Sequence, residues 1–344
     1  MGWVEPLPGG RLLLHRPGSV EVHERESFLK GGSFLARRSQ PLSSLTLRPG
    51  SGMSAAPTPD GGWAISDVTR MWTATPDGTT CWELPDDILP GGIDGLRIRG
   101  TPSVSPDGSL VTLVVSMLGT EPSEPVSFAY DGRPLGSQPA TDVLLLLDAA
   151  SGEALGRQEV AVESVDARLE WHPDGDLVAV SCWGLWRSWT THWLEAHRDG
   201  LHRLGGMSMG QAVGFVPGSS RLLTVRRAEN FAADDDVNEL ALYDTRTSER
   251  LALFDHEELL VTPDSADRTD VHPLDAAHVI VASDRRREDG QRWKGVHWLC
   301  DAATLRPLGR LRYSRCPQYG HVQPLGDGTW LTRHGSRVHR WSLP

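Results

Sequence analysis

The sequence predicts an all-β fold made of seven repeats, and three observations lead to it. A proline-centred turn recurs about every 50 residues along the 344-residue chain. A short apolar strand follows each turn, and no repeat has the 3.6-residue period of an amphipathic helix. A second turn, built on an aspartate, recurs further along several repeats. A strand-only repeat of roughly 50 residues is typical of a blade of a β-propeller.

The proline-centred turns divide the chain into its repeats. Proline fixes φ at the start of such a turn, and a following Asp-Gly or Gly supplies the left-handed geometry that closes it. Their leading residues are Pro6, Pro59, Pro106, Pro173, Pro217, Pro273 and Pro324. The strands predicted directly after them span residues 11–14, 63–65, 110–115, 177–180, 222–225, 278–282 and 330–331.

An aspartate ends a later strand in several repeats. Asp148, Asp244 and Asp301 each follow an apolar run and precede a short polar turn. A carboxylate at this position can accept backbone N–H bonds and close the turn between the third and fourth strands. We therefore predict seven blades of four antiparallel strands. Six or eight blades are the alternatives, because the last repeat has room for only three strands and residues 25–51 have room for an extra strand at 45–47.

The two turn motifs together resemble a known repeat. Ser-Pro-Asp-Gly-Ser-Leu-Val at 105–111, followed by Leu-Asp-Ala-Ala-Ser-Gly-Glu at 147–153, resembles the WD40-like and TolB-like bacterial β-propeller repeat. The Trp-Asp signature of a standard WD40 protein and the sialidase-type aspartate box are absent from the sequence. The resemblance implies one propeller over residues 1–344, its ring closed between the N- and C-terminal strands. It implies little about function, because propellers bind, scaffold and catalyse.

Long insertions fall between the second and third strands of four consecutive blades. They span about residues 117–141, 183–190, 226–238 and 284–294. Loops on a rigid scaffold carry function, so we expect a binding surface on this face, over blades three to six. The alternative is that surface insertions are merely tolerated.

Aromatic and arginine side chains in these insertions are the candidate contact residues. Four of the thirteen tryptophans lie between residues 183 and 193, with Trp186 and Arg187 at the expected loop tip. An exposed tryptophan beside an arginine suits a protein hot spot or a stacking platform for a sugar or a base, whereas packing between blades is the alternative. The candidate binding residues are Trp186, Arg187, Trp189, Phe231, Arg285, Arg286, Arg287 and Trp293.

The charged loops of blades five and six each allow two interpretations. Asp234–Asp236 could chelate calcium, but the ligand spacing of a calcium loop is missing, so a solvated acidic loop is favoured. Arg285–Arg287 could pair with that acidic loop or hold an anionic ligand. Gly206–Gly210 matches the nucleophile-elbow string G-x-S-x-G, but no helix is predicted after it, so the motif has no hydrolase context. We predict no metal site and no cofactor.

Composition excludes some classes of function. A net charge of −11 disfavours sequence-independent nucleic-acid binding, and no apolar run is long enough to span a membrane. The four cysteines form no C-x-x-C pair, which suits free thiols in the cytoplasm. The favoured hypothesis is a cytoplasmic module that presents its loop-rich face to a protein partner. The alternatives are a lyase or hydrolase with its site at the channel mouth on that face, and a small-molecule or sugar sensor.

Overall fold

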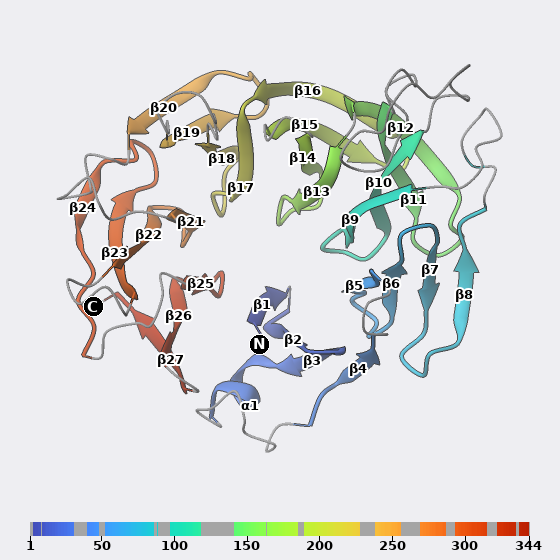
Figure 1. The fold of residues 1–344 in the computed structure, drawn as a ribbon, viewed down its shortest axis with the longest axis horizontal. Coiled ribbons are helices and arrows are strands. Elements are labelled where there is room, and N and C mark those ends of the chain that lie inside the picture. Colours follow the sequence, from blue (N-terminus) through green and yellow to red (C-terminus); the bar gives the residue numbers. More distant parts are fainter. Residues whose placement is uncertain are drawn as a thin grey trace, which may run out of the picture. The chain divides into compact units, whose positions relative to one another are not determined.

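The strands of the described residues form seven antiparallel sheets (Figure 1). The computed structural model describes residues 3–7, 9–30, 40–47, 52–85, 88, 97–117, 141–162, 164–184, 189–227, 238–255, 269–286, 293–314, 322–334 and 337–343. Within these residues, six sheets have four strands and one has three. The protein is an all-β, seven-bladed β-propeller, which confirms the predicted fold class.

The chain divides into two compact units. The first comprises Met1–Leu47, His172–Asp174 and Gly210–Pro344, and the second comprises Arg48–Trp171 and Gly175–Met209. The second unit holds blades two to four, whose strands are β5 (Ser54–Pro57), β6 (Trp63–Ser66), β7 (Met71–Ala74), β8 (Thr80–Glu83), β9 (Arg97–Val104), β10 (Leu110–Met117), β11 (Thr141–Asp148), β12 (Ala154–Val162), β13 (Ser164–Trp171), β14 (Leu177–Gly184), β15 (Trp189–His197) and β16 (Gly200–Ser208). The first strands of these blades lie side by side, with β9 in contact with β5 and β13.

The first unit holds blades one, five, six and seven. Blade one comprises β1 (Trp3–Leu7), β2 (Arg11–Arg16), β3 (Ser19–Glu24), the helix α1 (Arg25–Lys30) and β4 (Ser43–Thr46). Blades five to seven comprise β17 (Gly210–Phe215), β18 (Arg221–Arg227), β19 (Asn238–Asp244), β20 (Arg250–Asp255), β21 (Thr269–Pro273), β22 (His278–Arg286), β23 (Trp293–Asp301), β24 (Pro307–Arg310), β25 (Val322–Pro324), β26 (Thr329–His334) and β27 (Arg337–Ser342). Their first strands are neighbours in the order β17, β21, β25, β1.

The predicted strands after the proline turns are all present, and two further elements lie within residues 25–47. The extra strand predicted at 45–47 is β4, which completes blade one by pairing with β3. The short helix α1 precedes it and was not predicted, because six residues carry too little periodic signal. The N-terminal strand β1 pairs with β2 as the first strand of blade one.

Each hydrophobic core lies between the facing sides of two consecutive blades. In β10, Val111, Leu113 and Val115 belong to the core shared with blade two, while Leu110 and Val114 belong to the core shared with blade four. Successive side chains of a strand point to opposite faces of its sheet. A blade packed on both faces therefore needs a nearly continuous apolar run, which is why the middle strands lack polar alternation.

The two turn motifs form as predicted. The Asp148 carboxylate accepts the backbone N–H groups of Ala150 at 3.0 Å and Ser151 at 2.9 Å. Gly108 closes the proline turn of blade three with φ of +77°, and a Cβ there would lie 2.5 Å from Cδ of Pro59 in the turn of blade two. The glycine is thus required both by its backbone conformation and by the close packing of consecutive turns.

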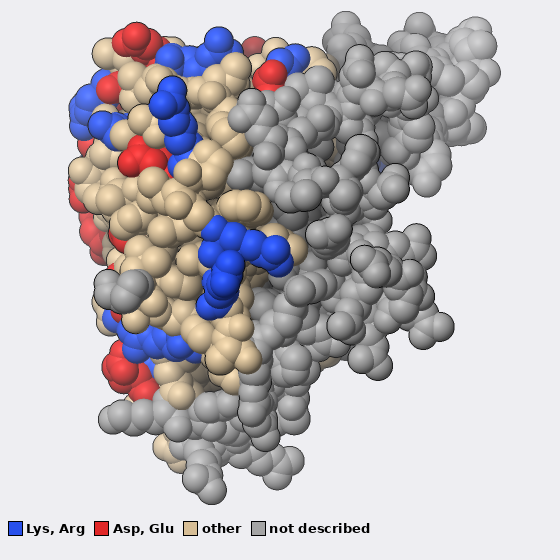
Figure 2. Space-filling model, turned by 90° about the vertical axis from the view of Figure 1, so that its left-hand side faces the viewer, with Lys and Arg blue, Asp and Glu red and all other residues tan. Residues whose placement is uncertain are grey.

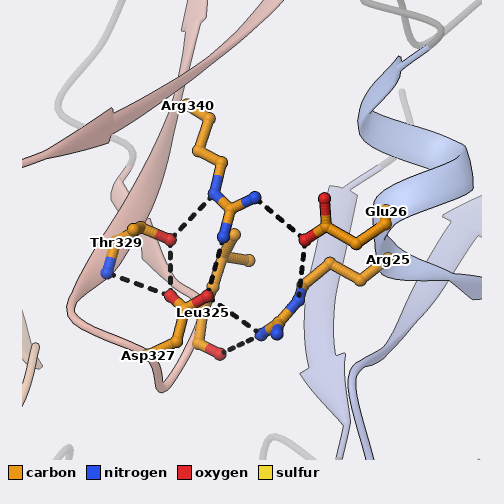
Figure 3. A network of polar contacts seen from close by, with 6 residues as sticks. All are labelled: Arg25, Glu26, Leu325, Asp327, Thr329 and Arg340. Atoms are coloured by element: carbon orange, nitrogen blue, oxygen red, sulfur yellow. Dashed lines mark hydrogen bonds and ion pairs between the residues drawn. The ribbon is translucent and has the colours of Figure 1, made fainter.

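A polar network connects blade seven to blade one (Figure 3). Arg340 of β27 donates to Asp327 at 2.7 Å and to Glu26 of α1 at 3.0 Å. Arg25 donates to the carbonyl oxygen of Leu325 at 3.1 Å and lies 3.4 Å from the Asp327 carboxylate. Partial burial acts to raise the pKa of Asp327, but hydrogen bonds from Thr329 and the two guanidinium groups hold it below its usual value. No helix among the described residues is long and apolar enough to cross a membrane.

Candidate functional site

The end of blades two to four at which each second strand passes to its third is the candidate site, and we call it the B–C end. It includes the turn 67–70 of blade two, the chain ends at Met117 and Thr141 in blade three, and those at Gly184 and Trp189 in blade four. The connection from β12 to β13 lies at the same end. The insertions of blades three and four leave from here, and most of their residues lie outside the described part of the chain.

Two tryptophans pair across the last rung of the β14–β15 hairpin. Trp183 and Trp189 are direct cross-strand partners, and their ring centroids lie 5.1 Å apart at an interplanar angle of 54°. Trp189 is buried, whereas Trp183 is half-buried. An aromatic cross-strand pair stabilises the end of a hairpin. It therefore fixes the two strand ends from which residues 185–188 emerge.

Arginines stack on tryptophans at two places of the B–C end. The guanidinium carbon of Arg168 lies 5.5 Å from the Trp189 ring centroid, and that of Arg70 lies 5.7 Å from the Trp72 ring centroid. Both distances are within the range of a cation–π interaction. Arg168 and Arg70 are exposed, so each positive charge is held over an apolar ring and remains accessible to solvent.

Exposed apolar side chains gather at the same end. Val68, Val162 and Val165 expose 52%, 56% and 42% of their surface. Among the described residues they are the only large exposed apolar side chains of the second unit. The opposite end of the same blades carries the polar Pro-Asp-Gly and aspartate turns. In the described part of this unit, the large exposed apolar side chains therefore all lie at the B–C end.

A β-bulge explains how Val165 reaches the surface. The pairing of β13 with β14 shifts register between Ser164 and Asp166. Ser164 and Ala167 are buried, and the two residues between them, Val165 and Asp166, are both exposed. A bulge inserts one extra residue and redirects the side chains around it. Here it turns a β-branched apolar residue outward.

A buried polar cluster supports the insertion of blade three. Asp142, which has no exposed surface, accepts hydrogen bonds from the Ser116 hydroxyl and from the Ser164 backbone N–H, the latter at 2.7 Å. Arg99 donates to the Ser116 hydroxyl at 2.8 Å, and its Nε lies 4.0 Å from the carboxylate. A buried carboxylate needs such compensation. The cluster thus fixes both strand ends that bound residues 118–140 and joins them to the start of blade four.

Two titratable groups below the tryptophan pair are held neutral. Burial, reinforced by the Asp142 and Asp166 charges, raises the pKa of the Cys182 thiol to about 12. Burial, with a smaller effect of Arg203, lowers the pKa of His192, whose Nε2 lies 2.8 Å from the carbonyl oxygen of Val160. Both side chains are therefore neutral and contribute to the packing between blades three and four. Among the described residues, no group of three His, Cys, Asp or Glu side chains is placed to hold a metal ion.

The residues proposed from the sequence are only partly covered by the structure. Trp189 is buried beneath Arg168, so it supports the surface rather than projecting from it. The strand pairing places Arg286 opposite Trp293 and Arg285 opposite Lys294 at the end of the β22–β23 hairpin in blade six. The remaining candidates lie outside the described residues: Trp186, Arg187, Phe231 and Arg287.

Sequence reasoning missed the exposed valines and the two stacked arginines. Val162 and Val165 lie in strands whose sequences are typical of core strands. No sequence pattern predicts the bulge between Ser164 and Asp166. Arg70 and Trp72 are two residues apart in the turn and strand that follow β6, which is a weak signal of a stacked pair. Arg168 lies 21 positions before Trp189, so only the folded sheet brings them together.

Comparison with solved structures supports the fold. The structure resembles an oligogalacturonate lyase in complex with manganese, with a TM-score of 0.53 and 12% identity over 99% of this chain and 88% of that one. It resembles the Kuenenia stuttgartiensis hydrazine synthase, with a TM-score of 0.51 and 10% identity over 99% and 94% of the two chains. The Dos1 propeller matches with a TM-score of 0.50 and 12% identity over 96% and 75%.

These similarities establish the architecture alone. The chain is structurally similar to seven-bladed β-propellers, and the similar proteins differ in function. No protein-family model and no curated protein sequence matches this sequence. The assignment of a function therefore depends on the surface of this chain.

Proposed function

We propose that the protein is a propeller-based binding module whose B–C end docks a protein partner. The observation that carries this proposal is the exposure of three valines at one end of blades two to four, beside two arginines stacked on tryptophans. Exposed apolar side chains together with aromatic and arginine side chains are typical of protein interfaces. The partner segment would be apolar, with an acidic side chain that meets Arg168, because Arg70 already lies 3.4 Å from the Asp67 carboxylate.

The rigidity of this surface favours docking. The Trp183–Trp189 pair, the Asp142 cluster and the interblade cores hold the exposed side chains on fixed strand ends, so little conformational entropy is lost on binding. The insertions of blades three and four begin at the same strand ends and would extend the contact area. The candidate residues Trp186 and Arg187 belong to this extension.

We further propose that the protein acts in the cytoplasm. Cys81, Cys182 and Cys300 are free thiols, and Cys182 and Cys300 are buried. Free cysteines of this kind are compatible with a reducing compartment.

The test compares two double variants with the same chemical change at different places. Val162→Asp with Val165→Asp puts two charges into the proposed contact. Leu251→Asp with Leu253→Asp puts two charges on β20 of blade five, where the leucines are 43% and 46% exposed. The tagged wild type and both variants capture proteins from native lysate, and quantitative mass spectrometry compares the recovered proteins.

The proposal predicts that the wild type and the leucine variant recover one or more of the same proteins. The amount recovered by the valine variant should be lower by about tenfold or more, because burying an unpaired carboxylate costs at least about 1.4 kcal/mol. Equal recovery with both variants would refute docking at the B–C end. Stabilisation by a metabolite, with no protein recovered, would favour the sensor alternative.

A further inference from the structure

The B–C end carries the same chemistry that its partner needs. A partner of this surface brings apolar side chains and a carboxylate that meets Arg168. Val165 and Asp166 are an exposed apolar and an exposed acidic side chain, next to each other in β13. Both are exposed because the β-bulge at the start of β13 places them between buried Ser164 and buried Ala167. The chain therefore presents both an arginine and the kind of carboxylate that pairs with it.

Asp166 and Arg168 lie on the same face of blade four. In the pairing of β13 with β14, Asp166 is opposite Trp183 and Arg168 is opposite Ser181. Residues two apart in a strand share a face of the sheet and lie about 7 Å from each other. The surface thus has two opposite charges at neighbouring positions of one strand, beside its exposed valines.

Local contacts orient both charged groups. Oδ1 of Asp166 accepts the backbone N–H of Ala167 at 2.9 Å. The guanidinium group of Arg168 lies over the Trp189 ring, with its carbon 5.5 Å from the ring centroid. Side chains that are held in place before binding lose less conformational entropy when a partner docks. Both remain exposed, so a partner can reach them.

We propose that the partner docked at the B–C end is a second copy of this chain, related to the first by a two-fold axis; this identification rests on the function proposed above. In a two-fold interface, every contact between two different residues occurs twice. An axis close to Ala167 places Asp166 of each copy opposite Arg168 of the other, which gives two ion pairs. The exposed valines of the two copies, Val162 and Val165, belong to the same contact.

The net charge of the chain opposes this association only weakly. Each copy carries a net charge of −11. At 0.15 M salt, charges separated by more than about 8 Å are largely screened. Ion pairs at contact distance are much less screened, and they strengthen when apolar side chains exclude water around them. At this salt concentration the two local pairs and the valine contact therefore outweigh the net repulsion.

Charge reversal at the two positions tests the pairing. Sedimentation equilibrium at 0.15 M salt measures the self-association of the wild type, Asp166→Arg and Arg168→Asp. Either variant alone places like charges opposite each other in the two-fold contact, so its dissociation constant should rise about tenfold or more. An equimolar mixture of the two variants restores both opposite-charge pairs. The mixed dimer, detected through a fluorescent label on one variant, should have a dissociation constant within about threefold of the wild type.

Two reversals on blades five and six are the matched controls. Glu249→Arg and Arg306→Asp change exposed residues and alter the net charge by the same amounts as the test variants. The outer strands of these blades, β20 and β24, lie on the side that Figure 2 shows, where acidic and basic side chains are interspersed on the described surface. The controls should leave the dissociation constant of the wild type unchanged.

Three results would overturn the proposal. The first is a wild type that remains monomeric at about 0.1 mM. The second is a dimer that neither reversal weakens, which would form through another surface. The third is a mixture of the two reversed variants that does not associate although circular dichroism shows that both are folded.

Failure of this proposal is distinguishable from failure of the proposed function. A monomeric wild type whose captured proteins are still lost with Val162→Asp and Val165→Asp would identify a different protein as the occupant of the docking surface. Capture that is unaffected by the valine substitutions, together with a monomeric wild type, would contradict both.

Discussion

The histidine buried between blades six and seven gives a quantitative test of the fold. His297 of β23 is 1% exposed, and its Nδ1 lies 2.7 Å from the Tyr313 hydroxyl, which accepts the indole N–H of Trp330 at 3.1 Å. Burial, with a smaller effect of His272, lowers the pKa of His297 to about 3. The ring is therefore neutral in the folded protein at pH values where it is protonated in the unfolded chain.

This difference makes stability depend on pH. An unfolded histidine titrates near pH 6.5, so between about pH 6.5 and pH 3 unfolding takes up one proton at this site and is favoured by acid. The contribution of the neutral ring is fully present above pH 6.5 and is lost as the pH falls toward 3. Linkage gives a loss of about 1.4 kcal/mol at pH 5.5 and about 2.7 kcal/mol at pH 4.5.

The substitution His297→Asn removes the titrating group and keeps an acceptor near the Nδ1 position. Urea unfolding of the wild type and the variant between pH 4.5 and 7.5 should give free energies of unfolding whose difference narrows by about 1.4 kcal/mol per pH unit below 6.5. Tyr313→Phe is the control, because it removes the two hydrogen bonds of the hydroxyl, costs about 2–4 kcal/mol at every pH and leaves the buried histidine in place. A difference between wild type and His297→Asn that stays constant with pH would show that His297 is not a buried neutral ring.

Three further predictions concern the turns, the link between blades and the thiols. Arg340→Met should lower the free energy of unfolding by about 1 kcal/mol at low salt and by less at 0.5 M salt, because its contacts with Asp327 are partly exposed; urea unfolding at two salt concentrations measures this. Asp148→Ala should cost about 1–2 kcal/mol in the same assay, since two backbone N–H groups lose their acceptor, and no change would contradict the turn geometry. In the folded protein at pH 8, iodoacetamide should modify the exposed Cys81 but not the buried Cys182, whose pKa of about 12 keeps it protonated; equal rates by peptide mass spectrometry would refute this.

The fold could be predicted from the sequence because its turns repeat. Pro106 with Gly108, and Asp148 with its polar turn, are local devices whose geometry depends on neighbouring residues, so the same residue types recur wherever the same turn recurs. The apolar run of β10 could also be predicted, because a strand buried on both faces needs apolar residues at nearly every position. That residues 1–344 form one closed domain remains a prediction.

The candidate site could be predicted only in outline. The sequence indicated an elaborated B–C end, and the apolar surface of blades two to four lies at that end. The sequence did not identify Val162, Val165 or Arg168, because their exposure depends on a bulge in β13 and on a stack between strands that are distant in sequence.

Site-specific photo-cross-linking tests the proposed docking surface most directly. The photoreactive amino acid p-benzoylphenylalanine replaces Val165 in one form of the protein and Leu251 in another, and both forms are irradiated in native lysate. The account predicts a discrete protein adduct from position 165 that is absent from position 251. An adduct from position 251 with none from position 165 would contradict the assignment of the B–C end as the docking surface.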